Sequence, residues 1–194
     1  MTDSRINTLR NWLKTLQASW QLDLISLVPA SADASFRRYF RIESKNPNFG
    51  TLIVMDAPPQ HEPLDAFIKV DLLLSDAGLN VPKILEQNIA EGFLLLNDLG
   101  TKTYLAELND ETANRLYGDA THALVQMQLG SKPGVLPNYD RELLQRELDL
   151  FPEWYLKKHL NIQLSAIQVS QLNQSFQAII ENNLAQAKVY VHRD

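Results

Sequence analysis

Three stretches of the chain carry residue types that could do chemistry, and one of them closes the printed sequence. There, an apolar stretch containing Val189 and Val191 runs into the triplet His192-Arg193-Asp194. An H-R-D triplet after a strand is a motif of catalytic loops, in which the aspartate accepts the proton of an attacking hydroxyl group. We therefore predict that Asp194 is a catalytic base; the alternative is a solvated tail.

The second stretch, SADASFRRYFRI, places small residues directly before a group of cations. Small side chains let backbone N–H groups approach a phosphate closely, and nearby guanidinium groups add positive charge. The cations are Arg37, Arg38 and Arg41, and Ser35 precedes them. Because the stretch lacks a G-x-G-x-x-G pattern, an ordinary hairpin with a basic exposed face is the alternative interpretation.

The third stretch, GFLLLNDLG, runs from apolar residues into Asn97 and Asp98, where the composition of the chain changes. An adenine ring could lie in a cleft at this boundary and bond the backbone near residues 95–97. The alternative is a core strand that ends in a turn.

Hydrophobic periodicity predicts the elements that would position these residues. The alternation in SFRRYFRIES has the period of a strand, and the apolar run Leu52–Met55 predicts another. Together with LISLVPA, VPKILEQ and GFLLLNDLG, they predict a mainly antiparallel five-stranded sheet. A helix over 3–20 precedes the sheet, and a helix at about 62–77 that ends at Gly78 is inserted in it.

The second part of the sequence is helical. Apolar spacing predicts helices at about 111–129, 140–159 and 168–186, followed by a short strand in KVYV. The chain is therefore predicted to be α+β, with a β-rich half over residues 1–98 and a helical half over residues 99–194.

Composition excludes several classes of protein. A net charge of −5 argues against the concentrated basic face that nucleic-acid binding needs. The absence of cysteine excludes disulfides and thiolate metal sites. No apolar run approaches the length of a membrane span, and the N-terminal stretch lacks the apolar region of a signal peptide. We expect a cytoplasmic protein that binds neither nucleic acid nor membrane.

Taken together, the motifs resemble the aminoglycoside phosphotransferase/choline kinase superfamily. The stretches ASFRRYFRI, LIVMDAPP, GFLLLNDLG, TYLAEL, YDRELLQRELDLFPEWYL and VYVHRD occur in this order over about residues 30–194. They are most similar to the bacterial N-acetylmuramate/N-acetylglucosamine anomeric kinases. The resemblance implies a protein-kinase-like bilobal fold, with the antiparallel lobe first and an incomplete helical lobe second.

The resemblance also implies a reaction and a set of site residues. The donor would be ATP with Mg²⁺, and the acceptor would be the C1 hydroxyl of an amino sugar, in peptidoglycan recycling. By position, Asp194 matches the catalytic base, and Ser35, Arg37 and Arg38 match the phosphate loop. The adenine pocket corresponds to Leu95, Leu96 and Asn97. The acceptor side corresponds to Tyr139, Asp140 and Glu142.

The sequence departs from the kinase pattern in two places. Met55 stands where a lysine of the third strand would hold the phosphates, so we expect Arg37, Arg38 or Arg41 to take that role. The asparagine and acidic metal ligands that should follow the H-R-D triplet are missing, so no metal ligand is assigned. We therefore expect a truncated, inactive chain; the alternatives are a non-catalytic nucleotide- or sugar-binding module and a helical interaction protein.

Overall fold

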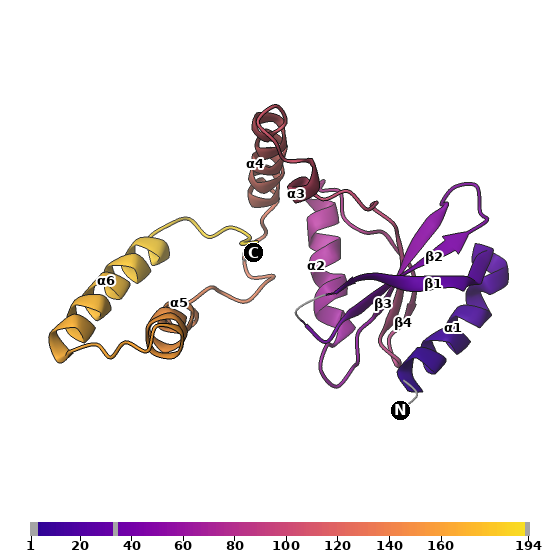
Figure 1. Ribbon diagram of the computed structural model, residues 1–194. Coiled ribbons are helices and arrows are strands. Elements are labelled where there is room, and N and C mark those ends of the chain that lie inside the picture. The colour runs from indigo at the N-terminus through magenta and orange to yellow at the C-terminus, as the bar shows by residue number, and fades with distance from the viewer. Residues whose placement is uncertain (1–3, 33–34, 193–194) are drawn as a thin grey trace. The chain divides into compact units, whose positions relative to one another are not determined.

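A computed structural model of the chain describes residues 4–32 and 35–192. Contacts between residues divide it into two units, Met1–Gly130 and Ser131–Asp194, which are described separately (Figure 1). The first unit contains α1 (Ser4–Trp20), β1 (Leu22–Ala32), β2 (Arg38–Ser44), β3 (Thr51–Asp56), α2 (Leu64–Asp76), β4 (Ile84–Asn88), β5 (Phe93–Asn97), α3 (Tyr104–Glu107) and α4 (Ala113–Leu129). The second contains α5 (Arg141–Leu150), the π-helix η1 (Phe151–His159) and α6 (Ala166–Leu184).

The five strands form one sheet in the order β1-β2-β3-β5-β4, and every neighbouring pair is antiparallel. This confirms the predicted five-stranded sheet with an inserted helix, α2. Strands β2, β3 and β5 are inner strands, so their backbone groups are paired on both edges. The register places Arg38 opposite Asp56 and Leu52 opposite Asn97.

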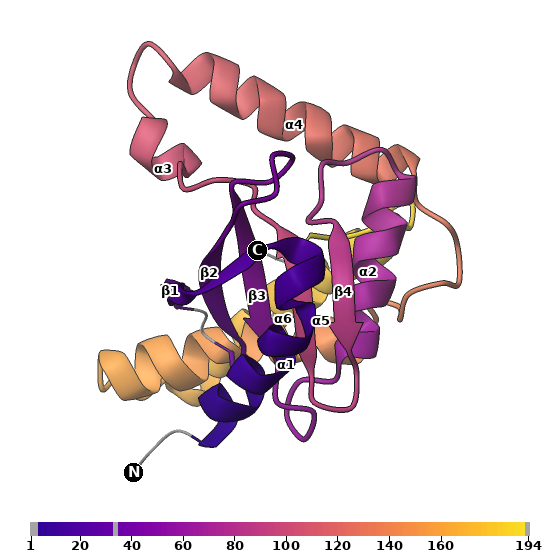
Figure 2. The same cartoon turned by 90° about the vertical axis from the view of Figure 1, so that its right-hand side faces the viewer.

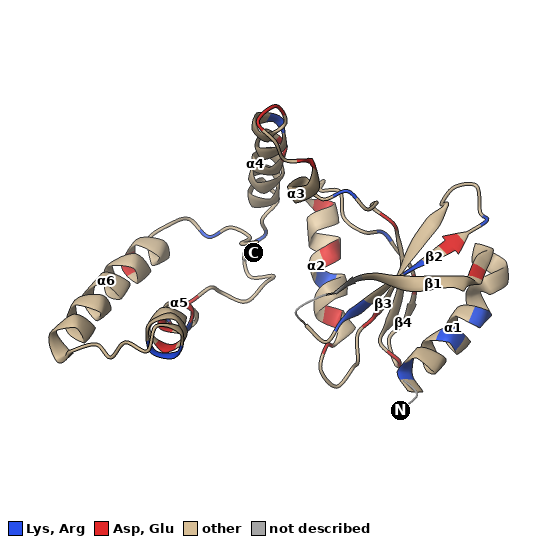
Figure 3. Cartoon of the chain, viewed as in Figure 1, with Lys and Arg blue, Asp and Glu red and all other residues tan. Residues whose placement is uncertain are grey.

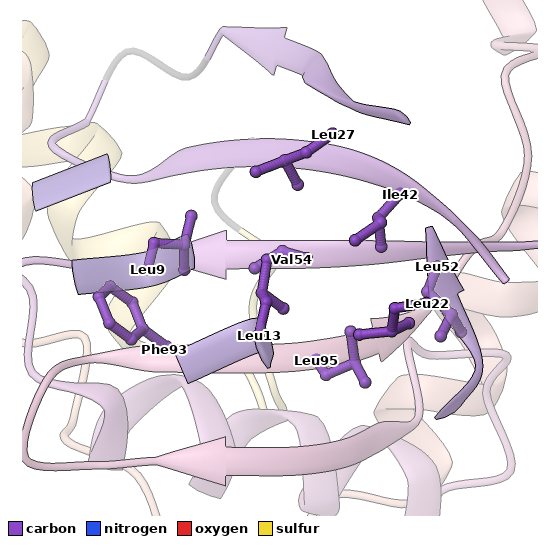
Figure 4. Packing of buried hydrophobic residues seen from close by; sticks show 9 residues of the cluster. All are labelled: Leu9, Leu13, Leu22, Leu27, Ile42, Leu52, Val54, Phe93 and Leu95. Carbon is purple, nitrogen blue, oxygen red and sulfur yellow. The ribbon is translucent and has the colours of Figure 1, made fainter. Parts of the chain in front are cut away.

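Both faces of the sheet are covered, because successive residues of a strand point to opposite faces. Helix α1 packs on one face, where Leu9 and Leu13 belong to the same buried cluster as Leu52 and Val54 (Figures 2 and 4). Helix α2 packs on the other face, where Met55 is fully buried. A fully buried leucine contributes about 1.5–3 kcal/mol. Burial on both sides explains why β3 is apolar at every position from Leu52 to Met55.

The end of α2 lies against the end of α4. Gly78 follows the C-cap of α2 and adopts φ +82°, as the predicted helix stop requires. The side-chain amide of Gln126 on α4 donates a hydrogen bond to the carbonyl oxygen of Gly78 (3.3 Å). This contact joins α4 to the unit that contains the sheet. The units therefore divide after Gly130, whereas the predicted lobe boundary at residues 98 and 99 stays a prediction.

The helix predicted over 140–159 is two helices of different pitch. The α-helical bonding of α5 ends at Leu150, and η1 continues with i→i+5 bonding, as between the N–H of Leu160 and the carbonyl of Tyr155. Pro152 explains the change, because proline has no N–H to donate and its ring clashes with the carbonyl four residues earlier.

The strand predicted in KVYV is wrong for the described chain. Residues 187–192 have no regular secondary structure, and none of the described strands pairs with them. The N–H of Tyr190 instead donates to the hydroxyl of Ser131 (2.8 Å). A β-branched stretch becomes a strand only when another strand accepts its hydrogen bonds.

Candidate functional site

Arg37 and Arg38 are neighbours in the sequence, but their side chains lie on opposite faces of the sheet. Arg38 lies on the α1 face, where its guanidinium binds the carboxylate of Asp56. Arg37 lies on the α2 face, near Glu62 and with its guanidinium carbon 6.0 Å from the ring centre of Phe67. One of the two can therefore face a ligand on the α2 side.

Asp56 is the centre of an ionic cluster on the α1 face. Its side chain is fully buried, and it accepts hydrogen bonds from Nε of Arg5 (2.6 Å) and from Nε and Nη2 of Arg38 (3.0 and 2.5 Å). Arg5 also donates to the carbonyl of Glu91 and lies over the ring of Phe93. A buried carboxylate needs such partners, because an unpaired buried charge costs several kcal/mol.

This cluster assigns Arg38 a structural role that the sequence did not suggest. Arg38 joins β2 to β3, and Arg5 joins α1 to the same carboxylate. The placement argues against the phosphate contact predicted for Arg38. The signal for the cluster was present in the sequence as an acid, Asp56, directly after a buried strand; only the register identified its partners.

Arg37 has the surroundings expected of a ligand-binding cation. Its Nε lies 3.3 Å from Oε2 of Glu62 without forming a hydrogen bond, although this nitrogen is buried. Among the described residues, the guanidinium of Arg37 donates no hydrogen bond. Its backbone N–H donates to the hydroxyl of Ser35 (3.1 Å), which fixes the turn before β2. The predicted phosphate role of Ser35 and Arg37 stays a prediction that this geometry supports.

Arg41 is held by Asp98 rather than turned toward a ligand. Its Nε and Nη2 donate to the two oxygens of Asp98 (2.5 and 3.1 Å). The hydroxyl of Thr51 and the N–H of Gly100 donate to the same carboxylate (2.8 and 2.9 Å). Chiefly because of the hydrogen bond from Arg41, the pKa of Asp98 is lowered to about 2. This brace fixes the chain where it leaves β5.

The strand β5 places the three predicted adenine-pocket residues in different surroundings. Leu95 is buried with α1, whereas Leu96 is buried with α2, so the two side chains cannot line one pocket. The N–H of Asn97 donates to the carbonyl of Lys83 (3.1 Å), and its side-chain oxygen accepts from the N–H of Lys83. The adenine-binding role of Leu95, Leu96 and Asn97 stays a prediction; of the residues that follow β5, Leu99 is 52% exposed.

The predicted acceptor residues lie together at the start of α5 in the second unit. Asp140 is the N-cap of α5, and its Oδ1 accepts from the N–H of Leu143 (3.0 Å). Glu142 is exposed in the first turn, and Tyr139 is half-buried. Helix capping alone accounts for an aspartate at position 140. The acceptor role of these three residues stays a prediction.

A buried acid that the sequence motifs did not identify, Asp71, lies on the α2 side of the sheet. Asp71 lies on α2, one turn after Phe67 and Ile68, which pack on the sheet. Its side chain is buried, and its Oδ1 has no hydrogen-bond partner in the part of the chain that the structure describes. Burial raises the pKa of this carboxyl. Its spacing of four and three residues from the apolar Phe67 and Ile68 was the available signal in the sequence. Figure 3 shows the acidic positions of α2 in red.

Asp194, the predicted catalytic base, lies outside the described residues. Within 4–32 and 35–192, no three histidine, aspartate or glutamate side chains are grouped so that they could hold a metal ion. We therefore assign none of the described residues to Mg²⁺. The same part of the chain contains no helix with the length and apolar character needed to span a bilayer.

Comparison with known proteins places this geometry in a family. The profile of the "Phosphotransferase enzyme family" matches residues 26–194. An N-acetylmuramate/N-acetylglucosamine kinase from Pseudomonas aeruginosa is 42% identical over 199 residues, which cover 99% of this chain and 58% of that protein. Kinases of the same name from Pseudomonas putida and Neisseria meningitidis are 45% and 40% identical, over 87% and 96% of this chain and 49% and 55% of their own. The chain spans about half the length of these relatives.

Proposed function

The chain belongs to the phosphotransferase enzyme family, and on that premise we propose that it binds ATP and takes part in phosphorylating the C1 hydroxyl group of N-acetylmuramate or N-acetylglucosamine. The names of the three relatives support this acceptor class. A place in peptidoglycan recycling and a cytoplasmic location belong to the same proposal. The family itself is the one that the sequence motifs predicted.

The hydrogen bonding of Arg37 is the observation that supports the proposed nucleotide binding. Its guanidinium lies beside the turn formed by Ser35, on the α2 face, and donates no hydrogen bond to a described residue. A guanidinium can bind a phosphate through two parallel N–H···O bonds. Arg38 and Arg41, by contrast, direct their donors to Asp56 and Asp98. We therefore assign the phosphate contact to Arg37.

The adenine would border the chain after β5. Leu99, 52% exposed, offers an apolar surface there, and the Arg41–Asp98 brace fixes the chain just before it. A fixed backbone at this point can bind a flat ring without first losing conformational freedom, which favours binding.

Bound ATP would supply the γ-phosphoryl group. Asp194 is proposed to accept the proton of the C1 hydroxyl as its oxygen attacks the γ-phosphorus. The bond from that phosphorus to the bridging oxygen breaks, and ADP leaves. Arg37 would counter the negative charge on the phosphates. No step is assigned to a metal.

Two measurements test the proposal. Calorimetry on the 194-residue chain should detect ATP binding, and Arg37→Ala should weaken it. The protein expressed from its natural gene should transfer ³²P from γ-labelled ATP to N-acetylmuramate or N-acetylglucosamine, giving a sugar 1-phosphate by ³¹P NMR. Binding without transfer to either sugar would favour a non-catalytic module, and absence of ATP binding would refute the proposal.

A further inference from the structure

Two adjacent contacts join the residues that precede β2 to the connection between β3 and α2. The ring of Phe36 stacks on the ring of His61, with centroids 4.5 Å apart and planes 20° apart. Next to it, Nε of Arg37 lies 3.3 Å from Oε2 of Glu62. We call these two contacts the loop clasp. It places a carboxylate beside the cation that we assign to the phosphates.

In the loop clasp, two residues that precede α2, His61 and Glu62, are fixed by backbone hydrogen bonds. The N–H groups of His61 and Glu62 both donate to the carbonyl of Pro58 (2.9 and 2.8 Å), which forms a tight turn before α2. Just before that turn, the N–H of Ala57 donates to the carbonyl of Gly92 (2.8 Å). His61 and Glu62 therefore have defined positions from which to contact Phe36 and Arg37.

The contact between Arg37 and Glu62 in the loop clasp is weak. The side chains of Arg37 and Glu62 are 31% and 23% exposed, and no hydrogen bond joins them. Partly exposed ion pairs contribute little to stability. The pair can therefore separate at small cost when a better anion arrives, and a phosphate can offer Arg37 the two hydrogen bonds that Glu62 does not accept.

We propose that Glu62 is an internal competitor of the nucleotide phosphates for Arg37, and so sets the nucleotide affinity; this inference rests on the proposed function. The carboxylate of Glu62 lies beside the guanidinium of Arg37, and its negative charge also repels an approaching phosphate. The Phe36–His61 stack keeps Arg37 beside Glu62. Removing the charge of Glu62 therefore tightens nucleotide binding, although the same change removes a salt bridge.

The test is a double-mutant cycle on the 194-residue chain, with ATP as the probe and displacement of a fluorescent ATP analogue as the readout. Glu62→Gln keeps the size of the side chain and should lower the Kd about two- to fivefold, the range expected for a partly exposed pair. Asp65→Asn is the matched control. It removes an exposed acid in the first turn of α2 and should leave the Kd unchanged.

The cycle is completed with Arg37→Ala. In that background Glu62→Gln should lose its effect on the Kd, because the contested cation is gone. A Glu62→Gln variant that binds no more tightly than the parent, or that tightens binding equally without Arg37, would overturn the inference while leaving ATP binding intact. A parent chain that does not bind ATP would overturn the proposed function as well. Equal melting temperatures for the parent, Glu62→Gln and Asp65→Asn would show that folding is not the cause.

Discussion

The guanidinium group of Arg41 on β2 holds both carboxylate oxygens of Asp98, the first residue after β5, with Nε and Nη2 at 2.5 and 3.1 Å. These two strands are not neighbours, because β3 lies between them. Thr51 of β3 donates to the same carboxylate, so one acid joins three strands. The pair therefore determines where the chain leaves the sheet.

The Arg41–Asp98 pair should make stability depend on pH in acid. The pKa of Asp98 is lowered from 3.8 to about 2 in the folded chain. A lowered folded pKa stabilises the fold above the unfolded pKa, and this stabilisation is lost as the pH falls from about 4 towards 2. Urea unfolding should show Asp98→Asn less stable at pH 7, on the order of 2 kcal/mol. The difference should shrink at pH 3. Asp65→Asn should show no such trend, and a difference that stays constant with pH would contradict the assignment.

Replacing the buried Asp56 should destabilise the first unit. Asp56→Asn removes the charge that pairs with Arg5 and Arg38, and breaking a buried ion pair costs about 3 kcal/mol or more. Urea denaturation measures the free energy of unfolding. Asp119→Asn is the control, since Asp119 forms an exposed pair with Arg115 and should change stability by less than about 0.5 kcal/mol. Equal losses in the two variants would show that the cluster is not structural.

Substitutions of the two neighbouring arginines should differ in their effects: Arg37→Ala should change ATP binding, and Arg38→Ala should change stability. Arg37→Ala should weaken ATP binding about ten- to a hundredfold, because charge-assisted hydrogen bonds contribute roughly 1.5–3 kcal/mol, and should leave the melting temperature nearly unchanged. Arg38→Ala should lower the melting temperature, since Asp56 loses one of its two cations. Calorimetry and thermal unfolding give the two readouts. A loss of ATP affinity in folded Arg38→Ala but not in Arg37→Ala would reverse the assignment.

Two glycine-to-alanine substitutions should change the free energy of unfolding in opposite directions. Gly92 adopts φ +75°, and a Cβ there would lie 1.9 Å from the carbonyl oxygen of Ala57. Gly92→Ala should therefore cost more than about 2 kcal/mol. Gly118 lies inside α4, and a Cβ added to it would meet no atom of the described residues within 4 Å, so Gly118→Ala should add about 1 kcal/mol. Urea unfolding compares them, and a stabilised Gly92→Ala would refute the close approach.

Periodicity was sufficient for most of the fold. The alternation in β2 and the apolar run of β3 predicted strands, and the spacing of α1 and α2 predicted helices, because each pattern reports burial along one element. Two predictions failed for different reasons. KVYV lacks a strand to pair with among the described residues, whereas Pro152 changes the helical pitch locally without ending the helix.

The site was predictable only in part. The motifs identified the residue types and the family, which the comparisons confirm. The motifs could not show that Arg37 and Arg38 lie on different faces of the sheet, nor that Leu95 and Leu96 do. In each pair one residue lies on the α1 face and the other on the α2 face. The acids that pair with the arginines could not be identified from the sequence, since each lies far along the chain from its partner.

The sequence by itself determined the elements, the antiparallel sheet and the membership of a phosphotransferase family, because local periodicity and motif order are written along the chain. Only the tertiary structure decided which carboxylate lies beside each arginine. Strand register brings Asp56 to Arg38, the end of β5 brings Asp98 to Arg41, and the turn before α2 brings Glu62 to Arg37. A charge acts through its nearest partners in space, and those partners exist only once the sheet has formed.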